Sequence, residues 1–499
     1  MPAPSLDSTR ARGAFLLLGS LALCLSNGAT AHPAAAWLAP VLLLRFAVTT
    51  SPLGGTAALA LAGAVASYVS MLGVIPIAQA EFLVTCVISG LLGTLPYLAH
   101  RLLAPALGSV AGTLVFPAAA VALAYALSLA SPFGSWGADG YVQAGFLPLM
   151  QFAAVAGVWG VGFFVFWCAS ASQGLFPPGP RRGRFAFGVF AVGFILALAC
   201  GSWRIWRAPE APDGVEVAAL STPAGLPDRF FDGCAGRDDS ACRDAGAWKR
   251  IDALFERSAA VAGTGAALVV WPEGSAQYDA PLEAEFVRRA QAFVRQHGVY
   301  LVAGTLRIPV DPAAAMDNQA LVFEPSGKLA FAYRKAVPVP GEDIVAGNGE
   351  IPTLDTPFGR LGVVICFDAD FPARVRQAGR RGVDVLAIPA NDWRAITPLH
   401  GQMARFRAIE NGFAVVRAAS NGWSVIADPA GRVLAASDAF RAPGGIATAR
   451  LSAAAARPTP YAEMGDAFAL GCLLFIAAAL LVVLARRLVH RRRQATASA

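Results

Sequence analysis

The sequence predicts a membrane protein with two parts: an α-helical membrane domain of about eight spanning helices, and an α/β domain placed before the last span. Composition is the first observation, because 56% of the 499 residues are hydrophobic and only 15% are charged, more apolar than an average soluble protein. The second is that long uncharged runs fill residues 14–201 and return near Phe468. The third is the polar interval between them, where short apolar runs alternate with turn residues and amphipathic stretches.

The spans are predicted by uncharged runs close to the ~20 residues that a helix needs to cross the hydrocarbon core of a bilayer. Seven lie before residue 204 and an eighth begins near Phe468. In chain order the runs are AFLLLGSLALCL, AAWLAPVLLL, TAALALAGAVASYVSMLGV, FLVTCVISGLLGTLPYLA, VAGTLVFPAAAVALAYALSLA, FLPLMQFAAVAGVWGVGFFVFW, FAFGVFAVGFILALAC and FALGCLLFIAAALLVVLA. We therefore expect a transmembrane domain at 1–204 and a final span with a basic cytoplasmic tail at 464–499.

The arginines near these runs give an orientation, because Lys and Arg in short loops stay on the cytoplasmic side of the membrane. With eight spans all of them fall on one side, and residues 205–463 face the opposite compartment, the periplasm of a bacterial inner membrane. These arginines are Arg10, Arg12, Arg101, Arg181, Arg182, Arg184, Arg486, Arg487, Arg491, Arg492 and Arg493. They supply much of the net charge of +7, which predicts contact with anionic membrane lipids and no nucleic-acid binding.

A cleaved signal peptide is the alternative interpretation of the first run, since Ala29-Thr30-Ala31 has the small-x-small pattern of a cleavage site. Cleavage would remove one span without moving the large polar interval to the other side. Both interpretations therefore place residues 205–463 outside the cytoplasm.

The polar interval at 205–463 has the pattern of an α/β domain. Strands are expected where short apolar segments are bounded by turn residues, at 214–220, 267–273, 299–305, 319–335 (a hairpin), 361–368, 383–390, 413–420 and 423–433. Amphipathic helices are expected near 245–262, 281–297 and 398–412. Strands that alternate with helices indicate a layered domain with a core of its own.

The eight cysteines do not form a disulfide framework, because five of them lie in predicted spans. Cys234 and Cys242 flank an acidic loop of the exported domain, where a disulfide and two free thiols are both open. Cys366 is the remaining thiol outside the membrane. The five histidines are far apart in the sequence, so we expect no metal site and no cofactor.

Three polar residues stand where apolar strands end: Glu273 in ALVVWPEGS, Lys335 in AFAYRKAVPVPGE and Cys366 in GVVICFD. Alone, each has a plain explanation as a solvated acid, a surface cation or a core cysteine. Together they make chemical sense, because a thiol with a pKa of ~8.5 needs a base to take its proton and a cation to favour the thiolate. Glu273 is the candidate base and Lys335 the candidate cation.

These residues, in the contexts WPEGS, YRKAVPVPGE and VICFD, resemble the nitrilase (carbon-nitrogen hydrolase) superfamily. The later block NDWRAITPLHGQMARFRAIENGFAVVRAASNGWSVIADPAGRV is similar as well, and the surrounding spans resemble the apolipoprotein N-acyltransferases within that superfamily. The resemblance implies an αββα sandwich and a Glu273-Lys335-Cys366 triad. It also implies Glu342 as a second, supporting acid, with the backbone N–H of Phe367 beside the nucleophile.

The chain departs from the acyltransferase pattern at three places. Cys366-Phe367-Asp368 replaces the usual Cys-Tyr-Glu, and the interval from Lys335 to Glu342 is one residue shorter than expected. An early Gln-x-Asn stretch is missing near residues 219–223. We expect these departures, Asp368 included, to bear on acceptor specificity more than on the nucleophile.

The resemblance implies transfer of a fatty acyl chain from a phospholipid to the N-terminal amine of S-diacylglyceryl-cysteine lipoproteins, through a Cys366 thioester in a ping-pong cycle. The implied partners are a phospholipid acyl donor, a diacylated lipoprotein acceptor and membrane lipids. Phe230, Phe231 and Trp393 are candidates for acyl-chain binding, with core packing or anchoring at the membrane surface as alternatives. For His400 we favour a buried, hydrogen-bonded structural role.

Two other functions remain open from the sequence. A membrane-anchored amidase of the same superfamily would use the same three residues and let water take the thioester. A transporter or receptor with a sensor domain would use none of these residues. Transport usually needs ionisable residues inside the membrane, and the predicted spans contain few of them.

Overall fold

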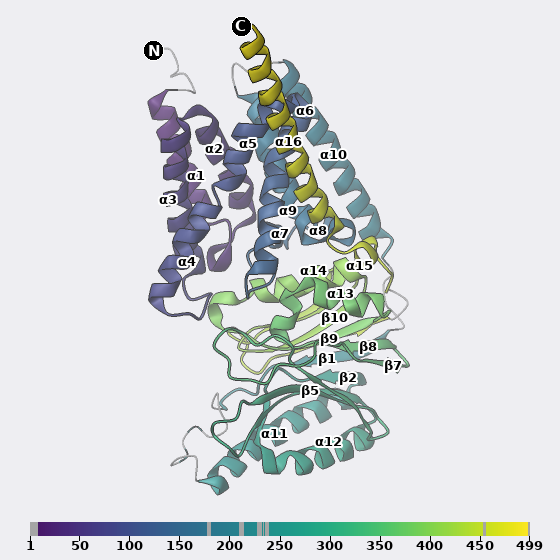
Figure 1. The fold of residues 1–499 in the computed structure, drawn as a ribbon. Helices are drawn as coiled ribbons and strands as arrows, with labels where there is room; N and C mark the ends of the chain where they lie inside the picture. The colour runs from purple at the N-terminus through teal and green to yellow at the C-terminus, as the bar shows by residue number, and fades with distance from the viewer. Residues whose placement is uncertain are drawn as a thin grey trace. The chain divides into compact units, whose positions relative to one another are not determined.

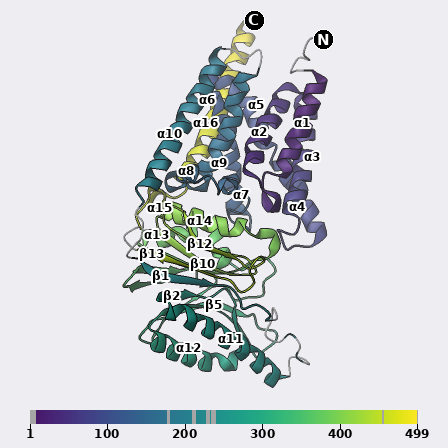
Figure 2. The same cartoon turned by 180° about the vertical axis from the view of Figure 1, so that it is seen from behind.

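A computed structural model describes residues 8–176, 181–208, 214–226, 232, 234, 239–452 and 456–497. The chain divides into two compact units, one made of Met1–Trp203 with Met464–Ala499 and the other of Arg204–Glu463 (Figures 1 and 2). The first unit is helical and the second is built of strands and helices.

The helical unit is a bundle in which the last helix of the chain packs beside α7 and α9 (Figure 1). Its main helices are α1 (Thr9–Cys24), α2 (Pro33–Thr49), α3 (Pro52–Met71), α4 (Gln79–Leu92), α5 (Leu95–Leu107), α6 (Ser109–Thr113), α7 (Val115–Ala130), α8 (Leu147–Met150), α9 (Ala153–Ser172), α10 (Arg181–Trp206) and α16 (Ala467–Ala497). Every run predicted to span a membrane is mainly helical here, and three of them are each divided between two helices by a short turn.

Six stretches of the described residues are long and apolar enough to cross a membrane, against the eight expected. They are Pro52–Met71, Gln79–Leu107, Ser109–Ala130, Ala153–Leu175, Arg181–Trp206 and Ala467–His490. The difference lies in α1 and α2, which have 16 and 17 residues. At ~1.5 Å per residue each is shorter than the ~30 Å hydrocarbon core.

One glycine interrupts α9. Gly157 has φ 64° and ψ −174°, a combination open almost only to glycine. The helix therefore bends at this point while remaining almost fully buried among its neighbours.

The α/β unit contains two sheets. The first has the order β13-β1-β2-β4-β5-β6, with β3 paired to β4, and the second has the order β12-β11-β10-β9-β8-β7. The first sheet comprises β1 (Val215–Leu220), β2 (Ala266–Val270), β3 (Ala276–Asp279), β4 (Tyr300–Ile308), β5 (Asp317–Phe323), β6 (Leu329–Arg334) and β13 (Ile446–Leu451). The second comprises β7 (Thr353–Thr356), β8 (Gly359–Val363), β9 (Val385–Asn391), β10 (Ala414–Ser420), β11 (Trp423–Ala427) and β12 (Val433–Asp438).

The α/β unit has two hydrophobic cores, because successive side chains of a strand point to opposite faces of the sheet. In β1, Val217 and Ala219 face the second sheet, whereas Ala218 and Leu220 face the helices α11 (Ser240–Gly263) and α12 (Glu283–His297). Helices α13 (Pro372–Arg380) and α14 (Leu399–Asn411) add their apolar residues to the core of the second sheet (Figure 1). The expected αββα sandwich is confirmed.

The sequence missed β3, β7, β13 and α13, because these elements are short or carry mixed polar and apolar residues. Cys234 and Cys242 are joined in a disulfide, which decides between the two alternatives left open above.

Candidate active site

The three candidate catalytic residues come from three strand ends. Glu273 follows β2, Lys335 directly follows β6, and Cys366 opens the short 3-10 helix η5 (Cys366–Asp370) after β8. Lys335 Nζ lies 2.8 Å from Glu273 Oε1 and 2.8 Å from Glu342 Oε2. Glu273, Lys335 and Cys366 are all buried. The fold thus brings the expected residues to one place, while their catalytic roles stay a prediction.

Glu273 is held by more than Lys335. Its Oε1 also accepts a hydrogen bond of 2.7 Å from Asn318 Nδ2, and its backbone N–H donates to Ala390 O at 3.3 Å, across to the second sheet. Sequence analysis missed Asn318. The available signal was a polar residue inside the apolar strand β5, where a buried amide needs a partner.

Lys335 remains charged. Burial lowers its pKa, but the negative charges of Glu273 and Glu342 raise it, and the net effect is a pKa above the usual value. The ammonium group is therefore a fixed cation at neutral pH and not a base.

Cys366 has an unusual backbone conformation. Its φ is 45°, in the left-handed region that residues with a Cβ seldom adopt. Side chain and main chain stabilise the turn together, because Asp368 Oδ2 accepts from Ile365 N at 3.2 Å and Asp368 N donates to Ile365 O at 2.9 Å. The thiol donates to the main-chain oxygen of Asn391 at 3.6 Å.

The thiol of Cys366 is protonated at neutral pH. Burial raises its pKa well above the ordinary value, and the carboxylate of Glu273 raises it further. Lys335 acts in the opposite direction without reversing the shift. Lys335 therefore favours the thiolate, as expected, but desolvation of a buried anion outweighs one neighbouring cation.

Asp368 has a structural position. Its carboxylate accepts hydrogen bonds from Tyr333 Oη at 2.8 Å, Val337 N at 2.8 Å and Ala336 N at 3.1 Å, in addition to Ile365 N. The residue is fully buried, and burial raises its pKa even though these hydrogen bonds lower it. It joins the nucleophile turn to the segment after Lys335, and its expected effect on acceptor specificity stays a prediction.

The remaining candidate residues differ in their burial and in their contacts. Glu342 also accepts from Val339 N at 2.9 Å. Phe367 is buried with its ring edge-to-face against Phe371. Trp393 is half-buried, two residues after Asn391. The other two candidates for acyl-chain binding, Phe230 and Phe231, lie outside the described residues.

A buried ionic cluster lies next to the nucleophile. His400 Nδ1 is 2.7 Å from Asp392 Oδ1 and Nε2 is 3.0 Å from Asp370 Oδ1, while Arg417 Nη2 is 2.6 Å from Asp392 Oδ1. Burial lowers the pKa of His400, but the two aspartates raise it to about 9. Burial raises the pKa of Asp392, and the charges of Arg417 and His400 reverse this and hold it below its usual value. His400 therefore has the buried, hydrogen-bonded position expected from the sequence.

Three possible metal-ligand atoms meet in this region, since those of Cys366, Asp392 and His400 lie within 4.8 Å of one another. The donor set does not suit a cation. Both nitrogens of His400 already contact carboxylates, and Arg417 contacts the same oxygen of Asp392. A protonated thiol and a protonated imidazole do not ligate metals.

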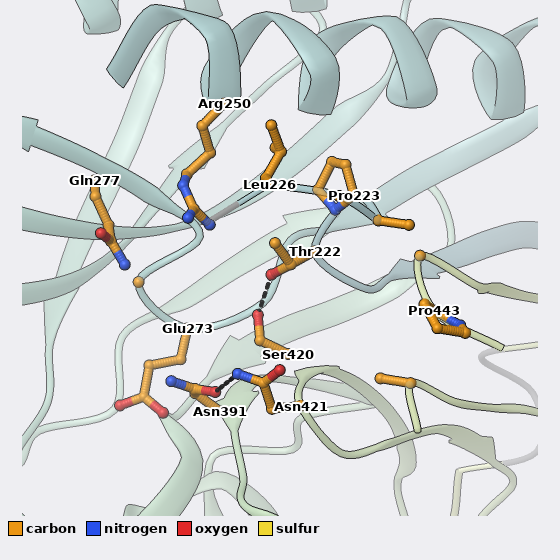
Figure 3. A pocket seen from close by; sticks show the side chains of 15 residues that line it. Thr222, Pro223, Leu226, Arg250, Glu273, Gln277, Asn391, Ser420, Asn421 and Pro443 are labelled. Atoms are coloured by element: carbon orange, nitrogen blue, oxygen red, sulfur yellow. Dashed lines mark hydrogen bonds between the residues drawn. The ribbon is translucent and has the colours of Figure 1, made fainter. Parts of the chain in front are cut away.

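A polar cavity of ≈ 180 Å³ adjoins Glu273 (Figure 3). It lies at the carboxyl ends of the parallel pairs β1–β2 and β9–β10, where sites in α/β folds collect. Its lining comprises Thr222, Pro223, Ala224, Gly225, Leu226, Arg250, Glu273, Gly274, Gln277, Asn391, Ser420, Asn421, Ala439, Pro443 and Gly444.

Residues 239–461 match the family model of carbon-nitrogen hydrolases. These residues form a carbon-nitrogen hydrolase domain. The apolipoprotein N-acyltransferase of Geobacter metallireducens is 27% identical over 412 residues, which cover 76% of this chain and 75% of that protein. The apolipoprotein N-acyltransferase of Bradyrhizobium diazoefficiens is 28% identical over 394 residues, which cover 72% of this chain and 70% of that protein. Among solved structures, an amidase from Nesterenkonia sp. AN1 gives a TM-score of 0.42 at 22% identity, covering 52% of this chain and 97% of its own.

The carbon-nitrogen hydrolase domain makes up less than half of the chain, whereas the similarity to the N-acyltransferase of Geobacter metallireducens covers 76% of it. The similarity therefore extends beyond this domain. The protein is therefore an enzyme of N-acyltransferase type with a carbon-nitrogen hydrolase domain. With its six long apolar helices it is a bacterial membrane protein.

Proposed function

We propose that this enzyme transfers a fatty acyl chain from a phospholipid to the N-terminal amine of S-diacylglyceryl-cysteine lipoproteins. The observation that carries the proposal is the buried Glu273–Lys335 ion pair beside Cys366, with Glu342 as a second and more exposed partner of Lys335, in a chain whose similarity to apolipoprotein N-acyltransferases covers most of its length. The same site with water as the acceptor would be an amidase, so the test must identify the acceptor.

In the first half-reaction, Glu273 takes the proton of Cys366 Sγ while the sulfur attacks the ester carbonyl carbon of the phospholipid. The oxyanion that forms is stabilised by the Lys335 ammonium and the backbone N–H of Phe367, each such donor contributing ~3 kcal/mol. The ester C–O bond then breaks, and Glu273 gives its proton to the leaving alcohol oxygen. A thioester on Cys366 and a lysophospholipid result.

In the second half-reaction, the neutral amine of the acceptor attacks the thioester carbonyl. Glu273 takes a proton from the attacking nitrogen, the C–S bond breaks, and the proton returns to Cys366 Sγ. The products are an amide and the resting thiol. The resting thiol of Cys366 is neutral and therefore holds the proton at the start and at the end of each cycle. Glu273 accepts and returns a proton in each half-reaction, so one carboxylate is enough for both.

We also place the α/β unit in the periplasm and the chain in the bacterial inner membrane. Two observations support this location: the arginines near the apolar runs fall on one predicted side, and a disulfide joins Cys234 to Cys242. Disulfides persist in oxidising compartments such as the periplasm. Both proposed substrates are lipids or lipidated, in keeping with a site attached to membrane helices.

The proposal is tested by mass spectrometry of the intact protein after incubation with phospholipid. We expect one added fatty-acyl mass on Cys366, which disappears when a diacylated lipopeptide is added and reappears on the amine of that peptide. Cys366→Ala should show no adduct, whereas Cys200→Ala, a change in the membrane helix α10, should behave as the native protein. Release of free fatty acid without N-acylated peptide would mean that water takes the thioester and that the enzyme is a hydrolase.

A further inference from the structure

The cavity beside Glu273 is polar on most of its walls. Three side-chain amides line it, from Gln277, Asn391 and Asn421, and two hydroxyls, of Thr222 and Ser420, which hydrogen bond to each other (Figure 3). Amides offer both donors and acceptors. A fatty acyl chain offers neither and would displace water from these polar groups without replacing its hydrogen bonds, so the cavity is a poor site for the lipid tails of the substrates.

A phosphate head group fits the lining little better. Phosphate oxygens only accept hydrogen bonds, and the wall contains the carboxylate of Glu273 and the amide oxygens as well as one cation, Arg250. A peptide differs, because each of its units carries one N–H donor and one C=O acceptor. A lining that mixes donors and acceptors matches a short extended peptide better than an anion.

The conformation of Asn421 adds a second observation. It has φ 48° at the end of β10, in the left-handed region, where Asn is among the few side chains that are tolerated. In this position it lines the cavity, and its Nδ2 lies 3.4 Å from Asn391 Oδ1. Asn421 lies in the turn between β10 and β11, which explains its left-handed backbone and fixes its side chain at the cavity wall.

The position of the cavity indicates which peptide it would bind. Glu273 lies in its wall and is the proposed base for the attacking amine. When that amine reaches Glu273, the residues that follow it in the chain must lie next to Glu273, and the cavity is the adjoining space. We propose that this cavity binds the first peptide units of the acceptor through the side-chain amides of Gln277 and Asn421. The inference rests on the proposed function and adds recognition of the polypeptide part to recognition of the lipid.

The test compares two acceptors in the full-length enzyme. One is a synthetic S-diacylglyceryl-cysteine followed by five residues of peptide, and the other is S-diacylglyceryl-cysteine amide, which has the same lipid and amine without the peptide. Two variants remove the proposed contacts: Gln277→Leu keeps the side-chain size, and Asn421→Gly suits the left-handed backbone. Gln296→Leu, the same exchange on an exposed position of α12, is the matched control.

The measured quantity is the ratio of kcat/KM for the peptide-bearing acceptor to kcat/KM for the cysteine amide. We expect the native enzyme and Gln296→Leu to favour the peptide-bearing acceptor, and each cavity variant to reduce this ratio by up to about tenfold, the effect of one lost hydrogen bond. The ratio cancels losses that come from folding or from acyl-enzyme formation.

Three results would overturn the inference. The first is a native enzyme that transfers to both acceptors equally, and the second is cavity variants that keep the native ratio. The third is a ratio that stays fixed while formation of the Cys366 adduct falls, which would assign the cavity to the phospholipid. If the native enzyme formed no adduct at all, the proposed function itself would fail, which is a distinguishable outcome.

Discussion

Cys366 combines a strained backbone with a thiol that stays neutral because it is buried. In the proposed mechanism the Lys335 ammonium acts on the transition state, where negative charge moves to the substrate oxygen. In the same proposal Glu273 takes the thiol proton, and its carboxylate is held by Lys335 and Asn318.

The first prediction concerns the ionisation of this thiol. We expect alkylation of Cys366 by iodoacetamide to be slow at neutral pH and to rise up to and beyond pH 9, because burial raises the thiol pKa well above 9.0. Peptide mass spectrometry measures the rate, with Cys366→Ala as the background. A rate that levels off near pH 7 would mean a resting thiolate.

The second prediction concerns Asp368. Asp368→Asn replaces one carboxylate oxygen with a donor that faces backbone N–H groups, so we expect a loss of about 2–3 kcal/mol in unfolding free energy. Urea unfolding of the detergent-solubilised protein measures it. The control is Asp355→Asn, at an exposed ion pair with Arg360, where a change below about 1 kcal/mol is expected. An equal loss in both variants would contradict the structural role.

The third prediction concerns pH. His400 has a folded-state pKa of about 9, above the ordinary 6.5, so its contribution to stability is complete below pH 6.5 and disappears as pH rises through about 9. Asp370, Asp392 and Arg417 are the charged groups that face it. The shift corresponds to about 3 kcal/mol. Urea midpoints should fall across this range in the native protein and change less in His400→Gln. A native-like slope in that variant would assign the effect elsewhere.

At the scale of elements, apolar patterns predicted the strands and helices that build the core of the sandwich. Glu273, Lys335 and Cys366 could be found because each is polar and directly ends such a pattern. The roles of Asn318 and Asp368 could not, since their partners come from strands distant in sequence. His400, Asp370, Asp392 and Arg417 belong to four different segments, which only the folded chain brings together.

The fourth prediction tests the bend in α9. Gly157→Ala places a Cβ where φ is 64° and ψ is −174°, so we expect a loss of at least about 1–3 kcal/mol, seen as a lower thermal midpoint in detergent. Gly188→Ala in α10 is the matched change, because its Cβ would meet no atom within 4 Å and alanine favours a helix. Equal midpoints for the two variants would argue against a required bend.

At the scale of the whole molecule, sequence and structure agree on a helical unit followed by an α/β unit and a last helix. The two differ in the number of membrane spans, because α1 and α2 are too short to cross the hydrocarbon core. The compartment of each unit depends on the membrane and on the arginines that flank the spans.

The fifth prediction tests this topology. Ser326→Cys lies in the exposed turn between β5 and β6, and we expect a membrane-impermeant maleimide to label it in intact spheroplasts. Arg182→Cys, at the exposed start of α10, should be labelled only after the membrane is permeabilised. Labelling of both or of neither before permeabilisation would contradict a periplasmic α/β unit. The unmodified chain provides the background of its own thiols.

Lys335 is flanked by two carboxylates and the thiol is neutral, so the group formed by Glu273, Lys335 and Glu342 carries one formal negative charge in excess. An incoming ammonium group is attracted to such a place, whereas the carboxylate of a free fatty acid is repelled. The acyl-enzyme keeps this imbalance, since a thioester is also uncharged. Electrostatic selection of this kind would disfavour reversal of the cycle by released fatty acids, even where lipids are concentrated.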